Sequence, residues 1–223
     1  HFCVLAGVTG RRVGGVPLGK RRFPGIFFGV TWIAMSKKIL LFDFDGVIVD
    51  TFDVCFEISK QFHTNLSVDE YRKWFEGNIN DRPRREDAKP SDDSRFFDLY
   101  SPRLFALTPV AGIAEVLGSL HQRYRMVIVS STINSPIEEY LRRHVLLTYF
   151  DKIFGSDVHK SKVEKIKMVF AQYGATAADC LFITDTLGDM VEAEKTGVAA
   201  LGVSWGYHPI ETLQRGNPIA MAH

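Results

Sequence analysis

Residues 39–51 of the chain read ILLFDFDGVIVDT, and the fold can be worked out from this stretch outward. The apolar run from Ile39 to Phe42 has the length of a buried parallel strand, and it ends in two carboxylates, Asp43 and Asp45, followed by Gly46. In an open α/β sheet, ligands bind just beyond the carboxyl ends of the strands. A glycine at that place lets the backbone approach a ligand closely. The stretch therefore predicts a functional site at the end of the first strand.

The spacing of Asp43 and Asp45 restricts the chemistry of this site. Side chains two residues apart in a strand point to the same side. Two neighbouring carboxylates repel each other unless a cation lies between them or one of them holds a proton. A hard cation such as Mg²⁺ takes oxygen ligands, and the two acids can serve as nucleophile and proton shuttle. The pair indicates phosphoryl transfer, and an aspartate pair that only forms a turn is the alternative.

The composition is that of an ordinary globular protein. Of the 223 residues, 46% are apolar and 24% are charged, which suffices for one full core and a small accessory domain. The net charge of +1 gives no argument for nucleic-acid binding. Cys3, Cys55 and Cys180 are too far apart in sequence to support a disulfide framework or a zinc site. We therefore expect a cytoplasmic protein without nucleic-acid or membrane partners.

Residues 1–34 differ from the rest of the chain, because they are rich in glycine and basic residues and contain no acid. Met35 stands shortly before the first strand and looks like a natural start. We expect residues 1–34 to be an unstructured or non-native extension, with a targeting segment as the alternative. The apolar piece from Ile26 to Ala34 is too short to span a bilayer.

The pattern downstream predicts an α/β core interrupted by a helical insert. Residues 53–107 are mostly helical, with a capping box at Ser67–Glu70 and an interruption at Pro102, and a crossover needs far fewer residues. Strands and helices then alternate up to a last expected strand at Ala199–Val203, which indicates a parallel sheet. We assign residues 35–52 and 108–223 to the core and residues 53–107 to a helical cap. The chain ends without a closing helix, and we expect a C-terminal truncation.

Polar groups recur at three predicted strand ends. Besides the aspartate pair, Ser130 follows the strand Met126–Val129, and Asp185 and Asp189 follow the strand Cys180–Thr184. A serine at a strand end is commonly a helix cap, and so is an aspartate. The order and placement of these groups together favour one shared site. A cluster of lysines lies between the last two strand ends, formed by Lys160, Lys162 and Lys165.

These residues resemble the motifs of the haloacid-dehalogenase-like superfamily of phosphohydrolases. The resemblance covers about residues 38–215: the first motif at Asp43–Val47, the second at Val129–Ser130 and the fourth at Thr184–Asp189. The segment Val203–Leu213 and the helical insert resemble the phosphoglycolate-phosphatase-like branch. The resemblance implies a three-layer Rossmann-like core and a Mg²⁺-dependent phosphatase acting through an aspartyl-phosphate on a small phosphorylated metabolite, phosphoglycolate-like or a sugar phosphate. We expect a monomer or a homodimer, between which the sequence does not decide.

The resemblance also implies catalytic roles. Asp43 would attack phosphorus, and Asp45 would protonate the leaving oxygen and later deprotonate water. Ser130 would hydrogen-bond the phosphoryl oxygens, with Gly46 and Ser131 as further phosphate-binding residues. Phosphoryl transfer depends mainly on positioning and charge stabilisation, which such a set supplies.

The implied Mg²⁺ ligands are Asp43, the carbonyl group of Asp45, and Asp185, with Asp189 nearby. The third motif of the superfamily is a lysine ahead of a helix, which offsets the charge of nucleophile and phosphate.

The identity of that lysine is ambiguous in this chain. Most of the branch has Lys-Pro at the motif, and the proline is missing here. Counting back from Gly174 favours Lys160 by the Lys-Pro pattern and Lys162 by the phosphoserine-phosphatase pattern, while Lys165 falls inside the helix. We predict Lys162, with Lys160 as the alternative.

Other functions share parts of this pattern. Asp45 argues against a dehalogenase, which needs no acid–base group at that position. A sugar phosphomutase and a catalytically inactive binding module remain alternatives. A phosphonate hydrolase would need a Schiff-base lysine in the cap, where Lys60 and Lys73 are expected to be solvated. A loop with Arg82, Arg84 and Arg85 is a candidate for reading an acidic substrate, and a solvated loop is the plainer interpretation.

Overall fold

Strand β1 (Ile39–Phe42) lies near the middle of a six-stranded sheet in which every strand pairs in parallel with its neighbours. The computed structural model describes residues 38–81 and 93–223. The strand order is β3-β2-β1-β4-β5-β6, so β1 is flanked by β2 and β4. The other strands are β2 (Arg125–Val129), β3 (Lys152–Phe154), β4 (Cys180–Thr184), β5 (Ala199–Val203) and β6 (Ala220–Ala222).

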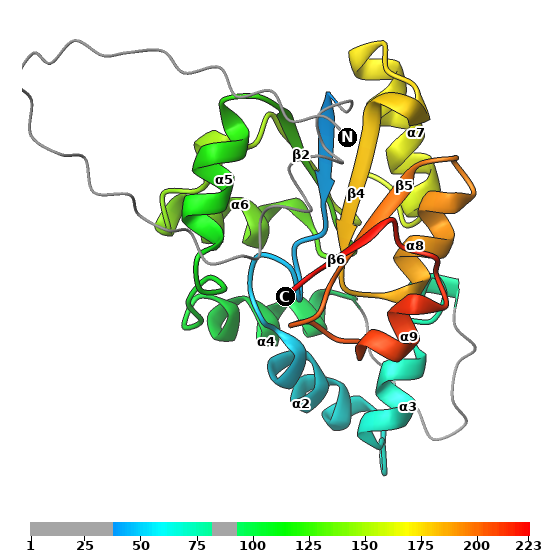
Figure 1. Ribbon diagram of the computed structural model, residues 1–223. Coiled ribbons are helices and arrows are strands. Elements are labelled where there is room, and N and C mark those ends of the chain that lie inside the picture. The colour runs from blue at the N-terminus through cyan, green and yellow to red at the C-terminus, as the bar shows by residue number, and fades with distance from the viewer. Residues whose placement is uncertain (1–37, 82–92) are drawn as a thin grey trace, which may run out of the picture.

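Successive residues of β1 pack into different layers. Leu40 and Phe42 belong to the core cluster that includes residues of α5 and α6, whereas Ile39 and Leu41 pack with residues of α7 and α8. Period-two alternation causes this division. Figure 1 shows α5 and α6 on one face of the sheet and α7 and α8 on the other, which confirms the three-layer α/β fold. The helices that follow the helical insert in the chain are α5 (Ile113–His121), α6 (Asn134–Arg143), η2 (Leu147–Tyr149), α7 (Lys162–Tyr173), η3 (Ala177–Asp179), α8 (Leu187–Glu194) and α9 (Ile210–Gln214).

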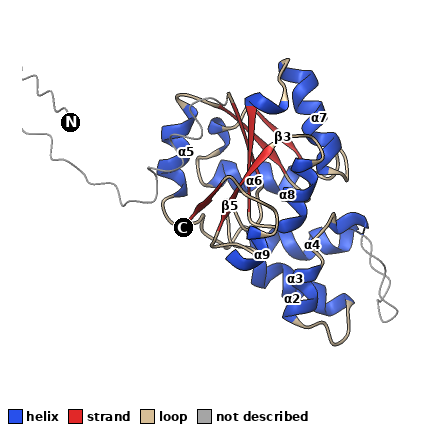
Figure 2. Cartoon of the chain, turned by 45° about the vertical axis from the view of Figure 1, so that its right-hand side comes forward, coloured by secondary structure: helices blue, strands red, loops and turns tan. Residues whose placement is uncertain are grey.

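A helical insert, residues 52–104, lies between β1 and the rest of the core. Its elements are α2 (Phe52–Phe62), α3 (Val68–Lys73), η1 (Ile79–Asp81) and α4 (Asp93–Leu104). The expected capping box is present, because Ser67 Oγ accepts from the Glu70 backbone and Glu70 accepts from the Ser67 backbone. Figures 1 and 2 show these helices gathered at the end of the sheet toward which β1 points.

Backbone and side-chain contacts tie α3 and its following turn to the core. Arg72 Nε donates to the carbonyl of Tyr207 at 3.0 Å, and His208 Nε2 lies 2.9 Å from the carbonyl of Arg72. The backbone N–H of Gly188, at the start of α8, donates to the carbonyl of Phe75 at 2.8 Å. The helical insert is therefore held beside the ends of β4 and β5.

Two expectations about local structure are wrong. Ala199–Val203 is not the last strand, because β6 pairs with β5 after it; a three-residue strand two positions after Pro218 carries little periodic signal. Pro102 does not interrupt α4, which continues to Leu104. Only the last turn follows this proline, so few backbone hydrogen bonds depend on it.

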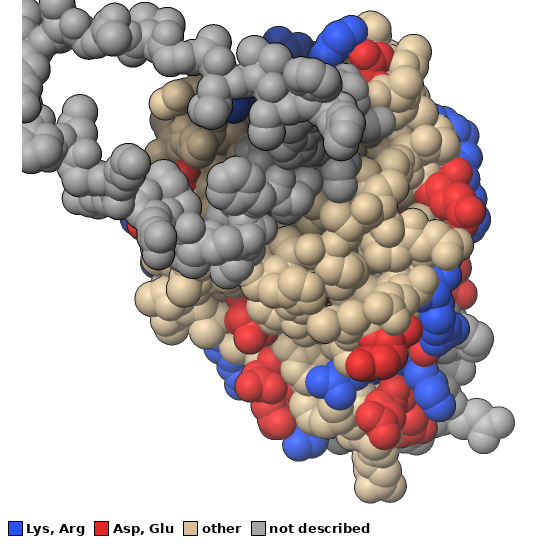
Figure 3. Space-filling view, in the orientation of Figure 1, with Lys and Arg blue, Asp and Glu red and all other residues tan. Residues whose placement is uncertain are grey.

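The predicted boundaries of the core (residues 35–52 and 108–223) and of the helical cap (residues 53–107) stay predictions. The expectations for residues 1–34 and for the arginines at 82, 84 and 85 concern residues outside the described part of the chain. Within the described part of the chain, no helix is both long and apolar enough to cross a membrane. On the face in Figure 3, acidic and basic side chains are interspersed over the lower half.

Candidate active site

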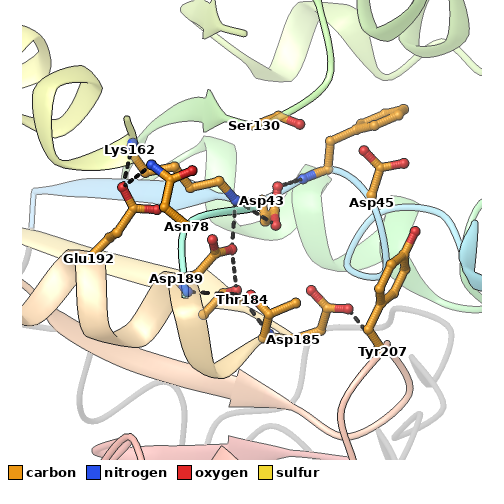
Figure 4. Close-up of polar contacts among 12 residues, drawn as sticks. Asp43, Asp45, Asn78, Ser130, Lys162, Thr184, Asp185, Asp189, Glu192 and Tyr207 are labelled. Atoms are coloured by element: carbon orange, nitrogen blue, oxygen red, sulfur yellow. Dashed lines mark hydrogen bonds and ion pairs between the residues drawn. The ribbon is translucent and has the colours of Figure 1, made fainter. Parts of the chain in front are cut away.

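Asp43 is the first residue after β1, and its side chain is almost fully buried at the carboxyl end of the sheet. Its Oδ1 accepts a hydrogen bond from the backbone of Phe44 at 2.7 Å, and its Oδ2 lies 2.8 Å from Lys162 Nζ. Burial raises the pKa of the Asp43 carboxyl well above its usual range, and the charge of Lys162 opposes that rise. Figure 4 shows Asp43 between Lys162 on one side and Asp45 on the other.

Lys162 begins α7 and reaches two carboxylates. Its Nζ lies 2.8 Å from Asp43 Oδ2 and 2.6 Å from Asp189 Oδ2, and its side chain is 2% exposed. Burial lowers the pKa of Lys162, but the two carboxylates outweigh this and the net shift is upward, so the lysine stays charged. Lys160 is exposed, and its carbonyl accepts a hydrogen bond from Asn80. The geometry therefore favours Lys162 over Lys160.

Asp185 and Asp189 follow β4 and complete the acidic side of the site. Asp185 is fully buried, and its Oδ2 accepts from the backbone of Tyr207 at 2.7 Å, while its Oδ1 has no hydrogen-bond partner among residues 38–81 and 93–223. Burial raises the pKa of Asp185 to about 7. Burial also raises the pKa of Asp189, but the charge of Lys162 and the hydrogen bonds that Asp189 shares with Asp43, Lys162 and Thr184 together outweigh it, and the net shift is downward. Thr184 Oγ1 donates to Asp189 Oδ2 at 2.7 Å.

These acids fit a hard cation. Three carboxylates, Asp43, Asp185 and Asp189, are buried beside Lys162, and a buried carboxylate oxygen without a partner is costly. Among the described residues, no group of three or more His, Cys, Asp or Glu side chains could hold a metal by itself. Mg²⁺ needs only one or two carboxylates beside carbonyl, water and phosphate oxygens, so the expected set of two carboxylates and one carbonyl is chemically suitable.

The backbone of Gly46 lies directly against the Asp185 carboxylate. Its φ is +72°, and a Cβ atom there would fall 1.9 Å from Asp185 Oδ2. Gly206 closes in from another side, with a Cβ position 2.3 Å from the same oxygen. No side chain fits at either position, so both glycines allow Asp185 to lie directly against the turn after β1.

Ser130 directly follows β2 and is fully buried. Its Oγ accepts from the backbone of Thr132 at 3.0 Å, which fixes the turn after the strand. Lys165 Nζ donates to the carbonyl of Ser130 at 2.5 Å, and burial lowers the pKa of Lys165 to about 7. Ser131 is half-buried in the same turn.

The family model described as haloacid dehalogenase-like hydrolase matches residues 40–203. The chain belongs to the haloacid dehalogenase-like hydrolase family. This confirms the resemblance read from the sequence motifs and the expectation of a hydrolase.

Two relatives and one solved structure are similar to this chain over most of its length. A protein named probable phosphatase IndB from Dickeya dadantii is 25% identical over 203 residues, covering 82% of this chain and 87% of that protein. A phosphoglycolate phosphatase from Synechococcus elongatus is 24% identical, covering 81% of this chain and 90% of that protein. The crystal structure of CbbY from Rhodobacter sphaeroides in complex with phosphate is 17% identical, covers 83% of this chain and 93% of that chain, and has a TM-score of 0.64.

Within the haloacid dehalogenase-like fold, the residues expected at three strand ends come together at one edge of the sheet. Asp45 differs from the others, because its carboxylate does not contact Asp43 or Lys162 but accepts hydrogen bonds from hydroxyl groups. Its donors are Thr51, Tyr100 and Thr132. The sequence analysis predicted none of these three donors. The hydroxyl-rich run at residues 130–132, which contains Thr132, was the one signal that could have indicated a donor.

Glu192 of α8 was also missed. It is 4% exposed, and its Oε1 accepts from the backbone of Lys162 at 2.9 Å, from Ser161 Oγ at 3.2 Å and from Asn78 Nδ2 at 3.2 Å. Glu192 thus anchors the first turn of α7, and with it the base of Lys162, to α8 and to the helical insert (Figure 4). No sequence motif marked it, because a glutamate within a helix is most often solvated.

Proposed function

We propose that this chain is a Mg²⁺-dependent phosphatase that hydrolyses a small phosphomonoester through a phosphoryl group carried on Asp43. The observation that carries the proposal is the contact of Lys162 with both Asp43 and Asp189, beside the unpartnered oxygen of Asp185. The relatives named phosphatase and phosphoglycolate phosphatase support the same reaction class.

In the first half-reaction, an oxygen of Asp43 attacks phosphorus while the bond from phosphorus to the ester oxygen breaks. The leaving oxygen takes a proton from Asp45. Lys162 offsets the negative charge that nucleophile and phosphoryl group bring together, and the turn from Ser130 to Ser131 supplies hydrogen bonds to the phosphoryl oxygens.

In the second half-reaction, water attacks the phosphorus of the phosphorylated Asp43. Asp45 takes the proton of that water, and the bond between phosphorus and Asp43 breaks, which returns the carboxylate and releases inorganic phosphate.

Mg²⁺ would be held by Asp43, the carbonyl of Asp45 and Asp185, with Asp189 nearby. When bound, it would supply positive charge beyond the one charge that Lys162 brings to the three carboxylates. The charge balance of the side chains is the reason for including the metal in this proposal.

We infer a small phosphorylated metabolite as substrate, with 2-phosphoglycolate as the first candidate because a relative carries that name. Phosphate release is measured for a panel of phosphomonoesters with Mg²⁺, with EDTA, and for Asp43→Asn. Asp53→Asn, at an exposed acid of α2, is the control. Release that needs Mg²⁺ and Asp43 but not Asp53 supports the proposal. A folded protein that only interconverts sugar phosphates, or releases no phosphate from any ester, contradicts it.

A further inference from the structure

Asp45 is held by hydroxyl groups from three separate parts of the chain. Tyr100 Oη donates to Asp45 Oδ1 at 2.5 Å, and Thr51 Oγ1 donates to the same oxygen at 2.7 Å. Thr132 Oγ1 donates to the other oxygen, Oδ2, at 2.7 Å. A carboxylate offers about four lone-pair positions, two on each oxygen. Both positions of Oδ1 are therefore occupied, while Oδ2, which has one donor among the residues that the structure describes, keeps a position for another partner.

Tyr100 is the one of these donors that comes from the helical insert, and it is fixed along its whole length. Its side chain is fully buried in α4, and its ring stacks on Phe96 with a centroid distance of 5.8 Å. The hydroxyl group then spans to Asp45, 55 positions away in the sequence. Since the ring is packed and its hydroxyl is bonded, Tyr100 can fix the orientation of the Asp45 carboxyl group.

We propose that Tyr100 is a positioning residue that makes Oδ2 the oxygen of Asp45 that exchanges protons with substrate and water. This inference rests on the proposed phosphatase function and assigns its acid–base atom. The proton leaves Oδ2 for the ester oxygen as the ester bond to phosphorus breaks, and Oδ2 takes the proton of the attacking water in the second step. Without the Tyr100 hydroxyl, the carboxyl group loses one of two bonds on Oδ1 and can turn, because its terminal torsion is broad.

The test compares two leaving groups in wild type and Tyr100→Phe. An alkyl phosphate must receive a proton at its leaving oxygen, whereas p-nitrophenolate leaves p-nitrophenyl phosphate without one. The quantity measured is kcat/KM, which includes steps up to release of the alcohol and so excludes the second half-reaction. We expect kcat/KM to fall about tenfold or more for the alkyl phosphate and less than about threefold for the aryl phosphate.

Tyr140→Phe is the matched control. Tyr140 is also fully buried, but its hydroxyl has no hydrogen-bond partner in the described part of the chain, and its ring packs edge-on against Phe44. We expect this variant to keep both values of kcat/KM. If Tyr100→Phe does not fold, Thr51→Val removes the other donor to Oδ1 at nearly constant volume and is expected to show the same selective loss.

Three outcomes overturn the inference. Equal losses on both esters would show that Tyr100 serves the fold rather than proton transfer, and unchanged values on both would show that its bond to Asp45 does not matter. A wild-type protein without activity on any ester overturns the proposed function, and the inference falls with it. The first two outcomes require an active wild type, so the two failures are distinguishable.

Discussion

Lys162 Nζ lies 2.8 Å from Asp43 Oδ2, and both side chains are almost entirely excluded from solvent. The lysine comes from the first turn of α7, whereas the aspartate follows β1, so the contact joins the helix layer to the centre of the sheet. A buried charge of this kind depends on its partner, because the loss of one member leaves the other uncompensated. If this pair acts as proposed, a change at either residue affects both turnover and stability.

Replacing Lys162 by methionine is expected to lower kcat by a factor of about 10² to 10³, because charge stabilisation of the phosphoryl group is lost. Removing one member of a buried pair also lowers the free energy of unfolding by about 3–5 kcal/mol. Phosphate release and urea unfolding measure the two effects. Lys160→Met, at an exposed residue of the same segment, is expected to change neither, and a collapse of activity in that variant alone would reverse the assignment.

Gly206→Ala is expected to displace Asp185, because the added Cβ would fall 2.3 Å from both the Cβ and Oδ2 atoms of that residue. Overpacking of this kind costs about 1–3 kcal/mol. We expect Mg²⁺ to raise the melting temperature of the wild type but not that of the variant, as measured by thermal unfolding with and without Mg²⁺. Gly77→Ala is the control, because no atom of the described residues lies within 4 Å of its Cβ position. A normal Mg²⁺ response in Gly206→Ala would contradict the arrangement.

The sequence was sufficient for those features that depend on local pattern. The apolar run before Asp43 and the capping box at Ser67 follow from short-range chemistry, and both are present. The grouping of Asp43, Ser130 and Asp185 follows from parallel topology, since the carboxyl ends of parallel strands meet at one edge.

Contacts across long sequence separations could not be read in this way. Tyr100 is one of several aromatic residues in α4, and its hydrogen bond to Asp45 depends on how the helical insert packs. Glu192 likewise acquires its role only when α8 lies beside the start of α7. Strand β6 was missed because three small or flexible residues, Ala220 to Ala222, form a strand only through the neighbouring edge of β5.

Val145→Gly is expected to stabilise the protein. Val145 has a φ of +58° just after α6 and is 77% exposed, so a β-branched residue adopts the left-handed region with little packing in return. That conformation costs valine about 1–2 kcal/mol, a cost that glycine avoids. Glycine loses more conformational freedom on folding than valine does, and this offsets part of the gain in stability. We expect a net gain of about 0.5–1 kcal/mol in urea unfolding, with unchanged turnover. Val158→Gly, at an exposed valine without a positive φ, is expected to give no such gain.

Lys165 is expected to make stability depend on pH. Burial lowers its pKa to about 7 in the folded chain, against an ordinary value of 10.5. Between these values the unfolded chain binds more protons than the folded chain, so the contribution of Lys165 to the free energy of unfolding rises with pH from about 7 to 10.5. The slope in this window approaches about 1.4 kcal/mol per pH unit.

Lys165→Met removes that titration and is expected to flatten the curve. The free energy of unfolding of the variant, relative to that of the wild type, is therefore highest near pH 7, where the folded wild type contains a destabilising buried ammonium group. This relative gain disappears as the pH approaches 10, because the wild-type lysine is then neutral in the fold. The lost hydrogen bond to the carbonyl of Ser130 adds an offset between the two curves. Urea unfolding of both proteins across this range measures the difference. Parallel curves would mean that the Lys165 ammonium group keeps its ordinary affinity for protons, and hence that water or another group solvates it inside the fold.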